Sequence, residues 1–122
     1  MRQESDFIGV KTIPPAAYWG VHTARAIENF PITGHSVAQM PELIRALALV
    51  KKAAAHANVQ LGAIDASQGD AIAKACDDLI AGKLHTEFVV DVIQGGAGTS
   101  ININVNEVIA NLALEHLGLA KG

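Results

Sequence analysis

The sequence predicts a mainly α-helical protein with a short β element near its N-terminus. Half of the 122 residues are hydrophobic but only 4% are aromatic, an aliphatic and alanine-rich composition that favours packed helices. Apolar residues recur at three- and four-residue spacing through much of the chain after residue 40. Near the N-terminus, residues 7–13 combine β-branched content with the loose alternation of a strand.

Length and charge limit the class of protein. A chain of this length is enough for one domain with a modest core, and 17% charged residues is typical of globular chains. The net charge of −3 and the lack of a Lys/Arg run argue against nucleic-acid binding. The single cysteine, Cys76, cannot form an internal disulfide, and no apolar run could span a bilayer. We therefore expect a cytoplasmic domain without nucleic-acid or membrane partners.

Local signals define the first elements. Pro14 and Pro15 end the strand over residues 7–13, because proline cannot continue a ladder. Residues 22–30 form a short amphipathic helix. Met40-Pro41 opens a long helix that continues to residue 61, since proline suits the first helical position, and Gly62 is its stop.

The helix over residues 41–61 has an unusually wide apolar surface. One stripe contains Leu43, Leu47, Val50, Ala54, Ala57 and Leu61. Ile44, Ala48 and Leu49 extend it, which predicts burial on more than one side.

The next helix begins near Asp65 or Ser67 and ends before Gly82. Ser67 with Asp70 three residues later indicates a weak capping box. Its apolar face comprises Ile72, Ala73, Cys76, Leu79 and Ile80. Residues 83–94 form a connection with a short turn or extended piece at Phe88–Val90.

The last segment carries two conflicting patterns. Residues 100–106 alternate polar and apolar, as a strand does, whereas Val105 to His116 fit a helix. Length favours one helix from Thr99 to about Gly118. A polar stripe then has two interpretations, a solvated face or a buried network between helices; its members are Asn104, Glu107, Asn111 and Glu115.

The chemistry is concentrated where this helix begins. Three glycines within residues 95–98 allow positive φ and close approach to a ligand, and Thr99 and Ser100 follow with hydroxyl groups. The first N–H groups of a helix lack intrahelical partners, so this turn is suited to a carboxylate or phosphate. The candidate binding residues are Ala97, Gly98, Thr99 and Ser100. The glycine-rich turn is neither a Walker A loop nor a dinucleotide fingerprint. The alternative interpretations are that the turn is an ordinary connector or that Thr99 caps the helix.

No metal or catalytic cluster is visible in the sequence. The five histidines have no HxH, HExxH or CxxC spacing, so we expect no metal site. Cys76 lies in an apolar helical pattern and is interpreted as a small buried residue. Tyr18 and Trp19 are interpreted as packing anchors.

Residues 95–109 resemble the first conserved region of the aspartase/fumarase superfamily, G-x-G-T-x-x-N-M-N-x-N-E, with Ile103 in place of the usual Met. Residues 18–23 and 94–100 are more similar to the aspartate ammonia-lyase branch than to class II fumarase. Further positions match the N-terminal pattern of the family: Arg2, Glu4, Asp6, Gly9, Pro14, Tyr18, Trp19, Gly20, Thr23, Arg25, Ala26, Asn29 and Phe30.

The resemblance implies that residues 1–122 are the N-terminal domain of a much longer enzyme, truncated before the central helical bundle. It implies a homotetramer that converts L-aspartate to fumarate and ammonia without an organic cofactor, with Thr99, Ser100 and the backbone at Ala97 and Gly98 in the substrate-carboxylate site. The serine-bearing base loop of the family does not occur in this sequence, so we expect no catalytic residue here and an inactive isolated chain. The alternatives are a class II fumarase domain and a non-catalytic fragment that associates through apolar helix faces.

Overall fold

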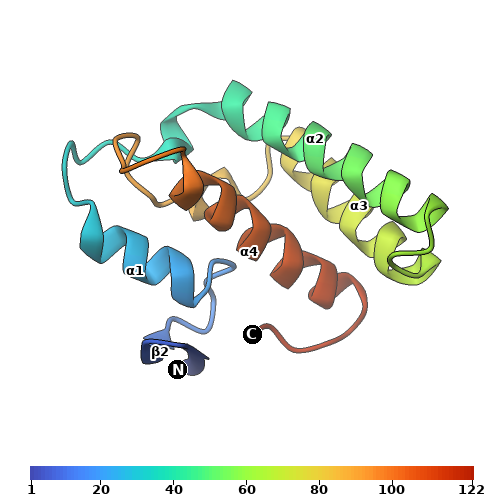
Figure 1. Cartoon of the computed structure of the whole chain (residues 1–122), viewed down its shortest axis with the longest axis horizontal. Coiled ribbons are helices and arrows are strands. Elements are labelled where there is room, and N and C mark those ends of the chain that lie inside the picture. Colours follow the sequence, from blue (N-terminus) through green and yellow to red (C-terminus); the bar gives the residue numbers. More distant parts are fainter.

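The computed structural model describes residues 1–122 as a β-hairpin followed by four α-helices (Figure 1). Two short 3-10 helices, η1 and η2, lie in the connections. The mainly α-helical prediction with a small β element is confirmed. The bounds are β1 Arg2–Asp6, β2 Gly9–Ile13, α1 Val21–Asn29, η1 Val37–Gln39, α2 Pro41–Gln60, α3 Ala66–Ile80, η2 His85–Glu87 and α4 Thr99–His116.

The β element is an antiparallel hairpin in which Arg2 pairs with Ile13 and Asp6 with Gly9. The predicted strand is therefore confirmed only from Gly9 onward, because Phe7 and Ile8 form the turn. The Asp6 carboxylate accepts the N–H groups of Ile8 and Gly9 at 2.9 and 3.1 Å and fixes that turn. β1 was not predicted, since a strand of five polar residues has no hydrophobic alternation to detect.

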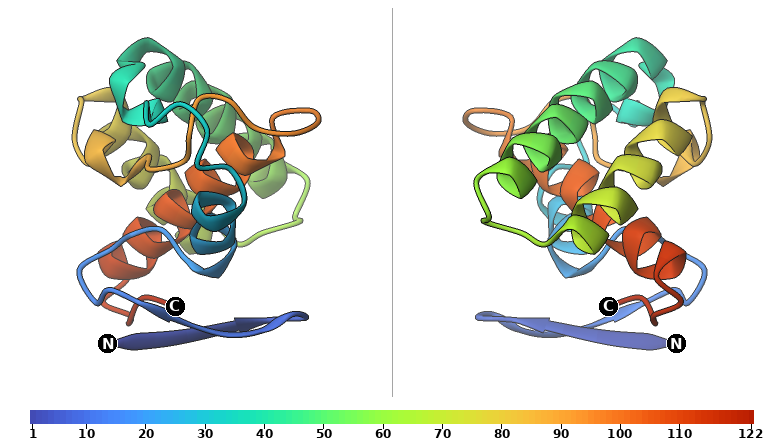
Figure 2. Two further views of the ribbon diagram at one scale, coloured as in Figure 1. Left: turned by 90° about the vertical axis from the view of Figure 1, so that its left-hand side faces the viewer. Right: turned by 90° about the vertical axis from the view of Figure 1, so that its right-hand side faces the viewer.

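The helices pack as two pairs (Figures 1 and 2). α2 and α3 lie side by side as an antiparallel hairpin, α4 packs on both of them, and α1 packs on α4. The β-hairpin lies as a separate layer beside the helices, and both termini lie near it (Figure 2). None of the helices combines the length and the apolar character needed to cross a bilayer.

The helix boundaries follow the local signals closely. α2 begins at Pro41 and α4 is one continuous helix, as predicted. Gly62 and Gly82, with φ of 70° and 91°, follow α2 and α3. Of the two predicted caps of α3, Asp65 is confirmed, because its side chain accepts the Gln68 N–H at 2.7 Å, and the alternative Ser67–Asp70 capping box is wrong. The capping box forms two residues earlier, between Asp65 and Gln68, because the Gln68 side chain accepts the Asp65 N–H.

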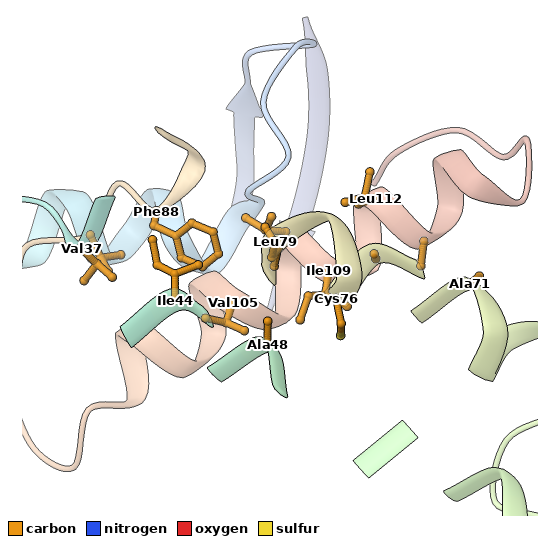
Figure 3. Packing of buried hydrophobic residues seen from close by; sticks show 14 of the residues in the cluster. Val37, Ile44, Ala48, Ala71, Cys76, Leu79, Phe88, Val105, Ile109 and Leu112 are labelled. Atoms are coloured by element: carbon orange, nitrogen blue, oxygen red, sulfur yellow. The ribbon is translucent and has the colours of Figure 1, made fainter. Parts of the chain in front are cut away.

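The core lies between α2, α3, α4 and the segment after η2 (Figure 3). On α2 the buried residues are Ile44, Ala48 and Ala55, so the predicted stripe was misplaced and the predicted burial on more than one side is wrong. Val50 and Leu61, which the stripe included, are 62% and 81% exposed because α3 and α4 cover only one side of the helix. The core residues are Ala26, Val37, Ile44, Ala48, Ala71, Ala75, Cys76, Leu79, Phe88, Val90, Val105, Val108, Ile109, Leu112 and Ala113.

Candidate functional site

Most of the polar stripe of α4 faces other segments of the chain, not water: Asn104 and Asn111 are buried and Glu107 is half-buried, whereas Glu115 at its end is exposed. Asn104 is fully buried, and its Nδ2 donates to the Glu87 carbonyl oxygen at 3.0 Å. Its Oδ1 accepts the Val90 N–H at 3.4 Å. Asn104 therefore ties the segment that precedes the glycine-rich turn to the first half of α4.

The second asparagine of the stripe fastens the far half of α4. Asn111 is 6% exposed, donates to the Tyr18 carbonyl oxygen at 2.7 Å and accepts the Gly122 N–H at 2.9 Å. The Tyr18 hydroxyl donates to Glu115 at 2.6 Å. That hydrogen bond, together with burial, raises the pKa of Tyr18 to about 12. Tyr18 also packs against the core, as predicted for a packing anchor.

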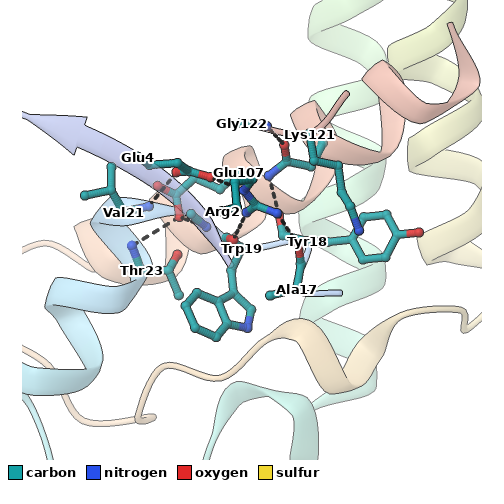
Figure 4. A network of polar contacts seen from close by, with 12 residues as sticks. Arg2, Glu4, Ala17, Tyr18, Trp19, Val21, Thr23, Glu107, Lys121 and Gly122 are labelled. Atoms are coloured by element: carbon teal, nitrogen blue, oxygen red, sulfur yellow. Dashed lines mark hydrogen bonds and ion pairs between the residues drawn. The ribbon is translucent and has the colours of Figure 1, made fainter. Parts of the chain in front are cut away.

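Glu107 holds the start of α1 (Figure 4). Its carboxylate accepts the N–H groups of Gly20, His22 and Thr23 at 2.8, 2.9 and 3.1 Å. α1 has no side-chain cap and no acidic residue in its own first turn. A carboxylate from another helix therefore supplies the acceptors that this helix N-terminus lacks.

The N-terminal strand adds a second carboxylate and a guanidinium to the same region (Figure 4). Glu4 accepts the Val21 N–H at 2.9 Å and pairs with Arg2 at 2.7 Å. Arg2 in turn donates to the carbonyl oxygens of Ala17 and Trp19 at 3.0 and 2.9 Å. The network therefore joins β1, the loop before α1 and the middle of α4.

The glycine-rich turn brings the four predicted binding residues together at the start of α4. Gly98, with φ of 76°, occupies the N-cap position, where a residue with a Cβ would be strained. Thr99 is the first helical residue, and no side chain of the turn makes a cap hydrogen bond, so the capping role considered for Thr99 is not found. The N–H groups and hydroxyls of Thr99 and Ser100 have no hydrogen-bond partner within the chain.

Ala97 and Thr99 are exposed, whereas Gly98 and Ser100 are half-buried. Two adjacent N–H donors and two hydroxyls thus share the positive end of an 18-residue helix. Such a group of donors is suited to an anion such as a carboxylate.

A pocket of about 350 Å³ lies beside this helix start, between α1, the hairpin turn and α4. Ser100 lines it, but Ala97, Gly98 and Thr99 do not. Arg25 donates to Asp6 at 2.6 and 2.7 Å, and these bonds hold the pKa of the Asp6 carboxyl well below its usual range. The charges of Arg25 and Asp6 neutralise each other, so neither group presents an unpaired charge to a ligand in the pocket.

The structure contains no cluster of three His, Cys, Asp or Glu side chains that could hold a metal ion. Cys76 is fully buried in the core, as the apolar pattern predicted. Burial is the main reason that the pKa of its thiol is raised to about 11. The thiol is therefore protonated and inaccessible at neutral pH.

Comparison with known proteins identifies the family. A family model described as "Lyase" matches residues 9–121. The chain belongs to this lyase family. It is 57% identical over 122 residues to the aspartate ammonia-lyases of Bacillus sp. and Helicobacter pylori, and 50% identical over 123 residues to that of Escherichia coli K12. The match covers the whole chain but only 26% of each of these relatives, so the chain spans about a quarter of their length.

Solved structures agree with this assignment. The chain superposes with a TM-score of 0.98 and 54% identity on the Brucella melitensis protein titled "fumarate lyase:delta crystallin", covering all of this chain and 28% of that one. It superposes with a TM-score of 0.91 and 33% identity on the class II fumarase of Schistosoma mansoni, covering 99% of this chain and 25% of that one. The resemblance drawn from the motif is confirmed, and the fold is that of the N-terminal region of this lyase family.

Two roles at the site were not visible in the sequence. The Gln94 side chain accepts the Ile101 N–H at 2.9 Å, and Asp91 accepts the Thr33 N–H at 2.8 Å. Gln94 and Asp91 lie in the irregular connection that comes before the predicted binding residues. No local sequence pattern predicts these partners, because Ile101 lies seven residues from Gln94 and Thr33 lies 58 residues from Asp91.

Proposed function

We propose that this chain is the N-terminal part of an aspartate ammonia-lyase and contributes donors to the substrate-carboxylate site. The observation that carries the proposal is the group of unpaired N–H and hydroxyl donors at Thr99 and Ser100, at the start of α4. Gly98 and Ala97 complete the turn around it. The relatives at 50–57% identity, which are named aspartate ammonia-lyases, support the choice of reaction.

The proposed reaction removes a proton from the carbon next to one carboxylate of L-aspartate, and ammonia leaves from the adjacent carbon as the double bond of fumarate forms. Proton removal places a second negative charge on that carboxylate. Preorganised N–H and O–H donors stabilise such a charge more strongly than they stabilise the ground state, which is how an oxyanion site accelerates a reaction. Thr99 and Ser100 are the residues of this chain that supply those donors, and the reaction requires no organic cofactor.

The second candidate is a class II fumarase, which also acts on a dicarboxylate. The Schistosoma fumarase shares the fold with a TM-score of 0.91, but at 33% identity rather than 50–57%. This difference favours the ammonia-lyase. A third candidate, a helical association fragment, draws on the exposed Leu49 and Val50 of α2, which are 56% and 62% exposed. Exposed apolar residues of this kind are also suited to contacts between subunits. We therefore propose that the full-length enzyme is a homotetramer, and we propose separately that it is cytoplasmic.

The test replaces Thr99 by alanine in the full-length enzyme that carries this sequence. If the hydroxyl acts mainly in the transition state, kcat falls roughly 10²-fold, equivalent to about 2.7 kcal/mol. If it only holds the ground-state carboxylate, KM rises with kcat little changed. Thr99→Ser keeps the hydroxyl and should recover most of the loss. Thr12→Ala, on the exposed side of the hairpin, is the matched control and should leave both constants unchanged.

Steady-state production of fumarate from L-aspartate and from L-malate distinguishes the two lyase candidates. The isolated 122-residue chain should produce none from either. A Thr99→Ala enzyme with a lowered Tm but unchanged kcat and KM would remove Thr99 from the substrate site.

A further inference from the structure

Gln94 spans the glycine-rich turn with its side chain. Its Oε1 accepts the Ile101 N–H at 2.9 Å, and its Nε2 donates to the Asp91 carbonyl oxygen at 3.2 Å. An N–H can only donate and a carbonyl oxygen can only accept, so the two partners fix the orientation of this amide. The side chain therefore joins the backbone before the turn to the first turn of α4.

The end of this bridge before the turn is rigidly held. The Asp91 carboxylate accepts the Thr33 N–H at 2.8 Å, the Thr33 hydroxyl at 2.9 Å, the Gly34 N–H at 3.0 Å and the Ile93 N–H at 2.8 Å. An isolated β-bridge pairs Asp91 with Ser36. Asp91 is thus anchored to a separate part of the chain, the loop between α1 and α2.

The turn between the two ends has no comparable support. No N–H group from Gly95 to Gly98 donates to another group of the chain. A Cβ added at Gly95 would meet the ring of Phe30 at 3.4 Å, so this glycine lies close to that ring. A four-residue stretch with three glycines would therefore sample many conformations unless its ends are fixed.

Gln94 also decides which helix donors remain free. The α4 N-terminus would otherwise present the N–H groups of Thr99, Ser100 and Ile101, and Gln94 consumes the third. The N–H groups and hydroxyls of Thr99 and Ser100 remain unpaired, and the Gln94 bridge fixes their direction relative to Asp91. A neutral amide does this without placing a negative charge at the anion site.

We propose that Gln94 is a positioning residue that orients the donors of Thr99 and Ser100 toward a substrate carboxylate. This inference rests on the proposed function. It assigns a role in carboxylate binding to a side chain that need not touch the substrate.

The decisive variant is Gln94→Glu in the full-length enzyme. Glutamate has nearly the same shape and keeps an acceptor for the Ile101 N–H, but it loses the donor to the Asp91 carbonyl oxygen and adds a negative charge at the helix end that binds the carboxylate. We expect KM for L-aspartate and the Kd of the unreactive dicarboxylate succinate to rise at least tenfold, with the rise reduced by added salt. The Tm should stay within a few degrees of the wild type, because a carboxylate is favourable at a helix N-terminus and this offsets the lost hydrogen bond to the Asp91 carbonyl oxygen.

A second variant, Gln94→Met, keeps the size of the side chain and removes both hydrogen bonds. It should raise KM and the succinate Kd by roughly tenfold and also lower the Tm, because the turn loses its bridge. The matched control is Gln68→Met. Gln68 also accepts an N–H at a helix start, that of Asp65 at 3.3 Å, but at α3. It should lower the Tm with no change in KM or Kd.

Unchanged KM and succinate Kd in Gln94→Glu would overturn the inference and leave Gln94 a purely structural residue. If Gln94→Met does not fold, Gln94→Glu still decides the question, since it retains the bond to Ile101. A failure of the proposed function is a separate result, because the wild-type enzyme would then convert no L-aspartate to fumarate.

Discussion

Replacing Glu107 by alanine should destabilise the chain more than any exposed carboxylate substitution. Glu107 lies on α4 and accepts three N–H groups at the start of α1, from Gly20, His22 and Thr23. The bonds to Gly20 and Thr23 are partly buried, whereas the bond to His22 is exposed. After the substitution, water can accept the exposed His22 N–H, but it reaches the partly buried N–H groups of Gly20 and Thr23 poorly.

The magnitude follows from these two bonds. Hydrogen bonds to a charged group contribute about 1.5–3 kcal/mol each. Taking the lower figure for partly buried donors, Glu107→Ala costs about 3 kcal/mol of unfolding free energy. This loss is a large part of the total stability of such a domain, which is roughly 5–15 kcal/mol. Each kcal/mol lowers the Tm of a domain of this size by about 4 °C, so the Tm should fall by about 12 °C. Glu107→Gln keeps one acceptor oxygen and should lose about half as much.

Urea unfolding followed by circular dichroism measures the loss, and amide hydrogen exchange localises it. Exchange at Gly20 and Thr23 should accelerate more than exchange within α3. The matched control is Glu42→Ala, because the Glu42 side chain is 85% exposed and pairs only with Arg45 at the surface. Its effect should stay below about 1 kcal/mol. Equal unfolding midpoints for Glu107→Ala and Glu42→Ala would refute the reasoning.

Two further predictions concern titratable groups. Burial alone would raise the pKa of Asp91, but hydrogen bonds from Ile93, Thr33 and Gly34 lower it from 3.8 to about 2. Its contribution to stability is therefore present above about pH 4 and lost as the pH falls toward 2, so the difference in urea midpoint between wild type and Asp91→Asn should shrink across that interval. For Cys76, whose thiol pKa is raised to about 11, a thiol reagent at pH 8 should react only after urea unfolds the chain. Rapid reaction of the folded chain would contradict the buried position.

Local sequence signals determined where the helices of this protein begin and end. Pro41 at the first position of α2 and Gly62 after its end act through backbone restrictions that belong to single residues. The glycine-rich turn before Thr99 acts in the same way, and α4 begins at Thr99 as the sequence predicted. The lyase resemblance came from a motif in this same stretch, residues 95–109.

Only the tertiary structure decided how the polar side chains are used. A stripe with the spacing of Asn104, Glu107 and Asn111 has the same sequence pattern whether it faces water or a buried network. The choice depends on backbone groups from Gly20, Glu87 and other distant segments that the fold brings to α4. β1 was missed for the same reason: its polar residues form a strand because Arg2 and Glu4 find partners in the loop before α1. The cost of burying an unpaired polar group selects these partners, and that cost depends on which segments surround the group after folding.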